Sequence, residues 1–262
     1  MPNDKFLNDI TESELKAELG AAFSEFSIRV FETLDSTNTE AKRQAMAGIR
    51  RSLTVAKSQS AGRGRMGRSF YSPAGSGVYF SLLLPFPGGL ERTVFLTCAA
   101  SVAVMRAVRT LTGKQTEIKW VNDLFFQGKK VCGILCESVI LGDTPSVIVG
   151  IGINVRSGEF PAELAEIAGS LCEDKLSENQ LIAAVCRELI SFLEDPRDAS
   201  WLADYRNHSL VLGKPVVFTR GDETFCGIAE AILEDGALLV RDKDGKEHFL
   251  RTGEISLRLS DH

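Results

Sequence analysis

Glycine and positive charge are concentrated in residues 60–70, which read SAGRGRMGRSF. This stretch satisfies the G-x-G-x-x-G pattern of dinucleotide-binding folds, and it departs from the Walker A phosphate pattern by having Arg68 in place of lysine. Both patterns require a helix to begin at the loop, so that its free N–H groups face the phosphates. The following residues, FYSPAGSG, contain proline and glycines that exclude a helix. We therefore predict a flexible, basic loop between two strands.

Three further polar clusters interrupt apolar parts of the sequence. They are Asp35-Ser36-Thr37-Asn38, Lys119-Trp120-Val121-Asn122-Asp123 and Gly150-Ile151-Gly152-Ile153-Asn154. The first two also fit purely structural roles, because Thr37 and Glu40 match a helix capping box and Asn-Asp is typical of a turn. Two glycines within a strand predict the close approach of a ligand or of another backbone. Asn154 needs a partner, either structural or a bound base.

Charge is unevenly distributed along the 262 residues. The formal net charge is −5, yet no Asp or Glu occurs between residues 41 and 90, where eight Lys or Arg occur. This balance argues against a generic nucleic-acid-binding protein and leaves open a pocket for a compact anion. With 44% hydrophobic and 25% charged residues, the chain can bury one large core, or a large and a small one.

The cysteines and the apolar runs indicate in which cellular compartment the protein is expected. The six cysteines lie mostly within apolar runs without paired C-x-x-C spacing, which predicts reduced core residues. Cys132 and Cys136 would share one face of a strand, but the absence of a nearby histidine argues against a metal site there. No run reaches the roughly 18 apolar residues of a membrane span, and the N-terminus lacks a signal-peptide pattern, so we expect a cytoplasmic protein.

The helices and strands that must position these clusters can be predicted from hydrophobic periodicity and from the residues that begin or end such elements. Helices are predicted at residues 11–20, 37–48, 91–113, 177–195 and 198–208, and strands at 26–34, 53–59, 78–84, 117–122, 129–141 and 146–155. Capping boxes begin the helices at Thr11 and Ser177. This mixture predicts an α+β fold, a mixed sheet with helices packed on it.

From Gly213 onward the sequence changes to short strands. Strands at residues 214–220, 223–233, 237–243 and 246–251 are separated by the hairpin signals Gly221-Asp222, Asp235-Gly236 and Asp244-Gly245. They predict a small β-barrel of about 50 residues that depends on the larger domain for stability.

In order and spacing, the polar clusters resemble those of the bacterial biotin-protein ligases, also called biotin-[acetyl-CoA-carboxylase] ligases. The matching motifs are STN at 36–38, Q-x-A-G-R-G-R at 59–65, KW-x-ND at 119–123, GIGIN at 150–154 and GEISLR at 253–258. The resemblance implies a mixed sheet like that of class II synthetases and lipoate ligases, followed by an SH3-like β-barrel. The implied domains are an N-terminal extension with a short helix (1–25), a catalytic biotin- and ATP-binding domain (26–210) and an SH3-like C-terminal domain (211–262).

The resemblance also implies an activity. Such enzymes use MgATP to convert biotin to biotinyl-5'-AMP, and then transfer the biotinyl group to a lysine of a biotin carboxyl carrier domain. Some relatives carry an N-terminal DNA-binding domain. Only some 25 residues precede the first predicted strand here, so we expect no specific DNA binding, while a homodimer is left open. A lipoate or octanoate ligase of the same fold is an alternative, as is a non-catalytic biotin sensor.

Residue by residue, the resemblance implies a biotin site and an ATP site. The biotin-contacting positions are Ser36, Thr37, Asn38, Gln59, Arg63, Gly64, Arg65 and Lys119. The ATP-binding positions are Arg65, Arg68, Phe70, Lys119, Asn122, Asn154 and Arg258, and Asp123 is a candidate magnesium ligand. The sequence departs from the family pattern at Met66, Phe70 and Val121, where Arg, Trp and Pro are usual.

Acid activation brings together two anions, the biotin carboxylate and the α-phosphate of ATP. A cation at ~4 Å contributes roughly 4 kcal/mol at an effective dielectric constant of about 20, so Arg63, Arg65 and Lys119 are the predicted catalytic cations. Lys119, a compact charge at the end of a rigid strand, is assigned the central role. The glycine-rich loop is predicted to close over the ligand as a lid that excludes water.

Overall fold

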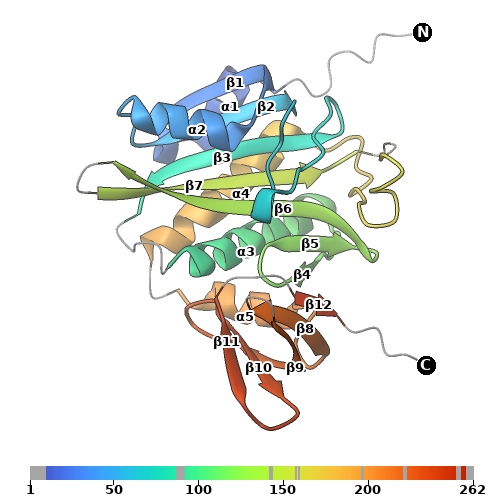
Figure 1. Ribbon diagram of the computed structural model, residues 1–262. Coiled ribbons are helices and arrows are strands. Elements are labelled where there is room, and N and C mark those ends of the chain that lie inside the picture. Colours follow the sequence, from blue (N-terminus) through green and yellow to red (C-terminus); the bar gives the residue numbers. More distant parts are fainter. Residues whose placement is uncertain are drawn as a thin grey trace.

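A seven-stranded mixed sheet forms the centre of the larger part of the molecule, in the order β1-β2-β3-β7-β6-β5-β4 (Figure 1). The strands are β1 (Ser27–Leu34), β2 (Ser52–Gln59), β3 (Gly77–Pro85), β4 (Glu117–Lys119), β5 (Asp123–Phe126), β6 (Lys129–Leu141) and β7 (Thr144–Asn154). Strands β1 and β2 are parallel, and every other neighbouring pair in this sheet is antiparallel. The computed structural model describes residues 10–86, 92–141, 144–156, 158, 160–195, 198–220, 223–251 and 255–257.

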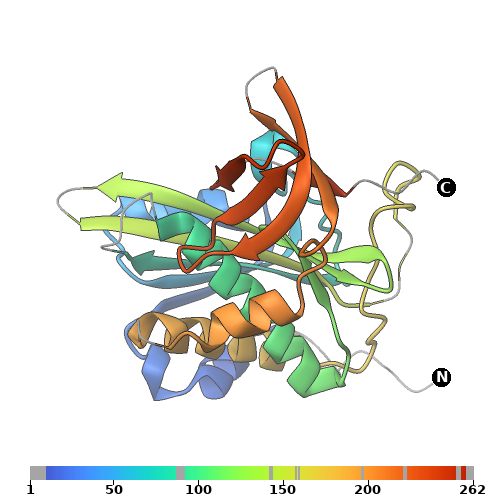
Figure 2. The ribbon, with the colours of Figure 1, turned by 90° about the horizontal axis from the view of Figure 1, so that it is seen from below.

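Helices cover both faces of this sheet, because alternate residues of its strands point to opposite sides. Leu82 of β3 and Val149 of β7 belong to the main core, whereas their neighbours Leu83 and Ile148 belong to a second cluster. The main core includes α3 (Thr93–Thr112) and α4 (Glu178–Glu194), and the second cluster includes α2 (Thr37–Met46). Figure 2 shows α3 and α4 together on one side of the sheet and the cyan turn of residues 65–67 on the other.

Helix α3 is the apolar centre of the fold. By length and composition alone it could cross a membrane, but 78% of its apolar window is buried inside the protein, as in a core helix. Helix α1 (Glu12–Leu19) packs against α4 and β1. As predicted, α1 and α4 begin with side-chain caps, since Thr11 accepts a hydrogen bond from the Glu14 N–H and Ser177 from the Gln180 N–H.

Two local predictions are wrong. The capping box from Thr37 to Glu40 does not form, because the N-cap of α2 is Ser36, without a side-chain cap, and Thr37 is already helical. The strand predicted at residues 117–122 ends at Lys119, and the chain turns and returns as β5, so that Lys119 pairs with Asp123. The Trp120–Val121 peptide bond in this turn is cis. The turn reads as a continuous strand because Trp120 and Val121 are both buried.

The cysteines are all free, as expected, but only some of them are core residues. Cys98, Cys132 and Cys186 are buried, whereas Cys172 and Cys226 are exposed. Burial raises the pKa of the half-buried Cys136 thiol to about 12.

The C-terminal part forms a separate antiparallel sheet in the order β11-β10-β9-β8-β12. Its strands are β8 (Pro215–Arg220), β9 (Glu223–Ile232), β10 (Leu238–Asp242), β11 (Glu247–Leu250) and β12 (Ile255–Leu257), and α5 (Ser200–Asn207) precedes them. Gly236 and Gly245 lie at two of the predicted hairpin turns with φ of 83° and 81°. The predicted turn at Gly221-Asp222 lies outside the described residues.

The turn at Gly236 joins the small sheet to the larger part. The Trp120 indole Nε1 donates a hydrogen bond of 3.0 Å to the Gly236 carbonyl oxygen. A Cβ atom on Gly236 would lie 3.1 Å from the Cys98 Sγ, so the close approach also requires glycine. The small sheet therefore supports the turn that carries Lys119 and Asp123.

Candidate active site

A cavity of about 310 Å³ lies where the four polar clusters meet. It is lined by Ser36, Thr37, Asn38, Gln59, Arg63, Gly64, Arg65, Arg68, Ser69, Phe70, Lys119, Trp120, Asn122, Asp123, Lys130, Gly133, Ile134, Leu135, Gly150, Ile151 and Gly152. The structure thus brings together every predicted site residue except two. Asn154 does not line the cavity, and Arg258 lies outside the described residues.

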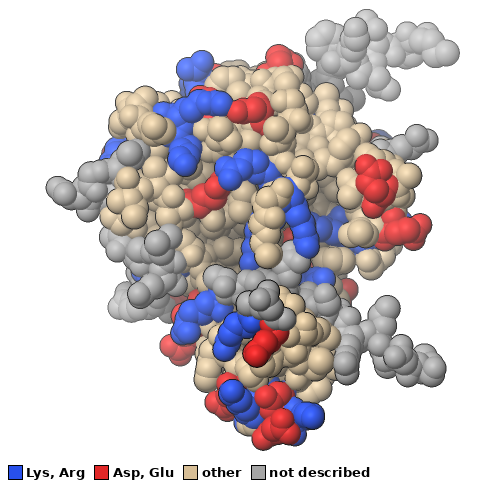
Figure 3. Space-filling view, viewed as in Figure 1, with Lys and Arg blue, Asp and Glu red and all other residues tan. Residues whose placement is uncertain are grey.

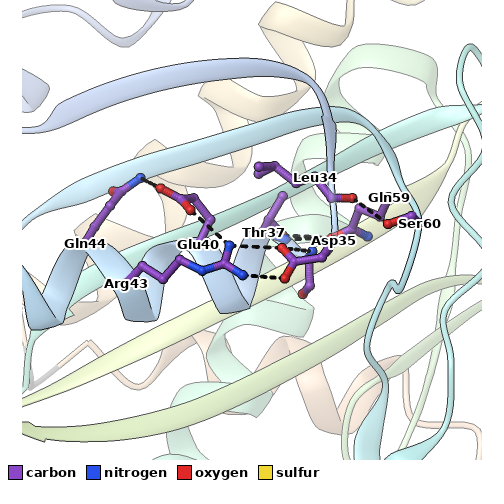
Figure 4. A network of polar contacts seen from close by, with 9 residues as sticks. Leu34, Asp35, Thr37, Glu40, Arg43, Gln44, Gln59 and Ser60 are labelled. Carbon is purple, nitrogen blue, oxygen red and sulfur yellow. Dashed lines mark hydrogen bonds and ion pairs between the residues drawn. The ribbon is translucent and has the colours of Figure 1, made fainter.

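The start of α2 is held against the end of β2. Gln59 Oε1 accepts hydrogen bonds from the Thr37 backbone N–H at 2.8 Å and from the Thr37 hydroxyl at 3.2 Å (Figure 4). Nearby, the Arg43 guanidinium hydrogen-bonds Asp35 and so holds the pKa of that carboxyl below its ordinary value. These contacts fix the polar N-terminus of α2 at one end of the cavity.

The floor beneath α2 is made by β3, β6 and β7. The Ser81 hydroxyl lies 2.8 Å from the Thr37 hydroxyl and donates to Asn38 Oδ1 at 2.7 Å. Asn38 Nδ2 donates to the Glu137 Oε2 at 2.8 Å. A Cβ atom on Gly150 would lie only 1.9 Å from Asn38 Oδ1, so glycine is required at this position.

The loop at residues 62–69, which we name the lid loop after its predicted role, folds back on itself and lines the cavity. It forms one short 3-10 turn at Arg65–Gly67 and, as predicted, starts no α-helix. Its ends are joined by a backbone hydrogen bond of 2.9 Å from the Phe70 N–H to the Gly62 carbonyl and by a bridge between Arg63 and Ser69. At its tip, exposed Met66 has a φ of 53°. On the face shown in Figure 3, lysine and arginine side chains gather around this loop.

Phe70 follows the lid loop and lies on the glycines of the sheet. A Cβ atom on Gly152 would be 2.5 Å from its ring, and one on Gly133 would be 3.1 Å from it. The predicted close approach at the two glycines of β7 is therefore made by the side chains of Asn38 and Phe70, not by another backbone. The ring gives the cavity wall a flat apolar surface.

The turn between β4 and β5 supplies the charged end of the cavity. Asn122 Nδ2 donates to the Ile134 carbonyl at 2.9 Å, and its Oδ1 accepts from Arg65 Nη1 at 3.0 Å. The Lys130 Nζ lies 2.7 Å from Asp123 Oδ1. The Lys119 Nζ lies 6.0 Å from the centre of the Phe125 ring, and no ion pair of Lys119 occurs in the part of the chain that the structure describes.

Three residues of the site escaped the sequence reasoning: Ser81, Lys130 and Glu137. Each is a polar side chain within a strand, and the strand register places it on the cavity side. One sequence signal could have found Lys130, which is the second residue after the Gln127-Gly128 turn between β5 and β6. Asn154 was expected on the ATP side, but its Nδ2 donates to the Gly169 carbonyl at 2.9 Å.

A metal site made by protein groups alone is absent from the described residues, since no group of three or more His, Cys, Asp or Glu gathers there. Asp123 and Asn122 nevertheless both line the charged end of the cavity, and each carries side-chain oxygen that could serve as a ligand. Magnesium is commonly held by one or two carboxylates together with substrate phosphates. The donor set fits a magnesium ion that arrives with a nucleotide.

Comparison with known proteins agrees with this geometry. Residues 21–154 match the biotin/lipoate A/B protein ligase family, and residues 211–258 match the biotin protein ligase C terminal domain. The biotin--[acetyl-CoA-carboxylase] ligase of Mycobacterium tuberculosis is 30% identical over 267 residues, covering 96% of this chain and 97% of that protein. The bifunctional ligase/repressor BirA of Bacillus spizizenii is 37% identical over 202 residues, but the match spans only 62% of its length and 74% of this chain.

A solved structure, biotin protein ligase from Aquifex aeolicus in complex with biotin and ATP, has a TM-score of 0.75 and 29% identity over 89% of this chain and 99% of that one. The fold and the site define a ligase that acts on a carboxylic acid, and the chain belongs to the biotin/lipoate A/B protein ligase family. The C-terminal match and the named relatives confirm the fold and the enzyme class predicted from the five motifs, those of a biotin ligase.

Proposed function

We propose that this chain uses ATP to convert biotin to biotinyl-5'-AMP and then transfers the biotinyl group to a lysine of a biotin carboxyl carrier protein. The observation that carries the proposal is the cavity itself, in which the buried hydrogen-bonding side chains of Ser36, Thr37 and Asn38 line one space with the cations Arg65, Lys119 and Lys130. We assign catalysis to residues 26–210, an SH3-like supporting domain to residues 211–262 and an extension to residues 1–25.

Biotin occupies the end beside α2 in this proposal. Ser36, Thr37 and Asn38 are almost fully buried and carry short donors and acceptors suited to a ureido group. Gln59 orients Thr37, and Gly64 and Arg65 cover the ligand from the lid loop. This arrangement directs the biotin carboxylate toward the turn between β4 and β5.

ATP occupies the charged end, with adenine against Phe70. A carboxylate oxygen of biotin attacks the α-phosphorus, the bond to the leaving oxygen breaks, and pyrophosphate carries away the electron pair. Lys119 is the central cation, and Arg65, Arg68 and Lys130 line the same cavity. Because each cation near 4 Å offsets about 4 kcal/mol of anion repulsion at an effective dielectric constant of about 20, the site works by placement and charge.

Asp123 and Asn122 would hold a magnesium ion, which supplies charge neutralisation on the pyrophosphate when bound. In the second step, the amine of the carrier lysine attacks the carbonyl carbon of the mixed anhydride. AMP leaves with the electron pair, and the amine gives up a proton. The lid loop keeps water from the anhydride until the carrier arrives.

ATP–pyrophosphate exchange with biotin, lipoate and octanoate in turn tests the proposal. We expect exchange that depends on biotin. Exchange with lipoate or octanoate alone would favour the other acid ligases of this fold, and no exchange with any acid would favour a non-catalytic sensor.

We further propose a cytoplasmic enzyme without specific DNA binding. With a net charge of −5, the protein is repelled by the phosphate backbone of DNA. A gel shift that depended on both DNA sequence and biotinyl-5'-AMP would refute this. The arrangement is compatible with a homodimer, which sedimentation would detect.

A further inference from the structure

Glu137, on β6, is a carboxylate in a site that must accept anions. Its Oε2 atom accepts a hydrogen bond of 2.8 Å from Asn38 Nδ2 and one of 2.9 Å from Arg63 Nη1. One oxygen atom therefore joins the fixed end of the cavity, at α2, to the lid loop. Gly133 and Leu135, on the same face of β6, line the cavity, so Glu137 continues this row beyond its edge.

The two partners of Glu137 depend on it unequally. Asn38 has other contacts, because its Oδ1 accepts from Ser81 and its Nδ2 also lies 3.2 Å from the Leu135 carbonyl oxygen. The Arg63 guanidinium, by contrast, is bound through its ion pair with Glu137. Removing the charge of Glu137 should thus leave Asn38 in place and release the lid loop.

The lid loop has a second attachment at its other side, from Arg65 to Asn122 at the charged end of the cavity. That contact lies where ATP is proposed to bind, so a phosphate can replace it. The Arg63–Glu137 pair lies at the opposite end, where no phosphate is expected. This attachment can therefore persist through both steps of the reaction.

We propose that Glu137 is a positioning residue that latches the lid loop through Arg63 and so retains biotinyl-5'-AMP until transfer. Arg63 is then the other half of the latch, and the cations that act on the phosphates are those at the charged end. This inference rests on the proposed function, because it concerns the intermediate of that reaction.

The test compares the variants Glu137→Gln, Arg63→Gln and the double variant with a control, Glu32→Gln. Glutamine at 137 keeps the length and a carbonyl oxygen for Asn38, but it loses the charge that holds Arg63. Glu32 forms an exposed ion pair of 2.7 Å with Lys57 away from the cavity, so the control removes a comparable surface charge. The rates of single-turnover adenylation at saturating biotin and of biotinyl-5'-AMP release are measured for each.

We expect roughly five- to tenfold faster release in each single variant. Adenylation should change by less than about twofold in Glu137→Gln, because Glu137 lies beyond the edge of the cavity. The double variant should release no faster than the single ones, because both remove one interaction. Added salt should speed release in the parent protein and have less effect on Glu137→Gln, since the pair is partly exposed.

Unchanged release in Glu137→Gln, or effects that multiply in the double variant, would overturn the latch. If Glu137→Gln fails to fold, Arg63→Gln alone decides, because Arg63 lies on a loop and is 45% exposed. A parent protein that forms no biotinyl-5'-AMP would refute the proposed function and the latch together, whereas normal formation with unchanged release refutes only the latch.

Discussion

Replacing Lys119 by glutamine removes the proposed central cation while keeping side-chain length and polarity. Lys119 ends β4 on the cavity wall, and no described acidic residue pairs with it. Its charge is therefore available to the reacting anions. At ~4 Å and an effective dielectric constant of about 20, the interaction is worth roughly 4 kcal/mol. Lys130 and Arg65 compensate in part, so we expect a loss of about 3–4 kcal/mol in the adenylation barrier, a hundredfold to a thousandfold in rate.

The assay is biotin-dependent ATP–pyrophosphate exchange, with single-turnover transfer to a carrier domain as the second measurement. Transfer from supplied biotinyl-5'-AMP should also slow, because the same cation stabilises the leaving phosphate. The affinity for biotin should fall less than the rate, since the uncharged contacts at α2 are untouched. Thermal melting serves as the folding control.

Lys130→Gln provides the informative comparison. Lys130 lies 2.7 Å from Asp123, so its removal takes away a cation and also leaves that carboxylate uncompensated among anionic substrates. We expect a loss at least as large as for Lys119→Gln. Near-normal exchange in a folded Lys119→Gln protein would refute the assignment of Lys119 as the central cation.

The remaining predictions concern residues that support the site from outside the group of reacting cations. Gly152→Ala places a methyl group 2.5 Å from the aromatic ring above it, so the ring must move and the KM for ATP should rise severalfold with little change in that for biotin, measured by steady-state exchange. Trp120→Phe leaves the buried Gly236 carbonyl without its indole partner and should lower the free energy of unfolding by about 1–3 kcal/mol, measured by urea titration. Because Arg43 lowers the pKa of Asp35, their pair stabilises the fold above the ordinary carboxyl pKa of 3.8 and stops doing so as the pH falls through the lowered value. The melting temperature of Arg43→Met should therefore approach that of the parent protein in acid, and a constant difference would contradict the linkage.

The long elements could be predicted because periodicity and caps act locally. Helix α4 begins at the predicted cap, Ser177, and β6 spans the predicted residues. The short turn after Lys119 could not be predicted, because the buried Trp120 and Val121 give it the same apolar pattern as a strand. Thr37 was assigned to capping for a similar reason, since the local pattern cannot show that Gln59, 22 residues away, takes its N–H instead.

The residues of the site likewise fall into those that the sequence predicts and those that it does not. Residues that stand in motifs could be found from the sequence. Those that line the cavity come from the start of α2, the end of β2 with the lid loop, the turn between β4 and β5, and the central strand β7. Ser81 and Glu137 belong to no motif, and their roles depend on which strand pairs with which. Register is a property of the folded sheet, since a shift of one residue would turn either side chain to the opposite face.

The contact between Trp120 and Gly236 spans 116 residues of chain. All seven strands of the large sheet have been synthesised once Asn154 is added. At about 5–20 residues per second, a ribosome then needs several more seconds to reach Gly236. Until that turn emerges, the acceptor that the folded protein provides for the Trp120 indole N–H, next to Lys119, has not yet been synthesised. Translation therefore makes the turn that carries Lys119 one of the last parts of the fold that can gain all of its contacts.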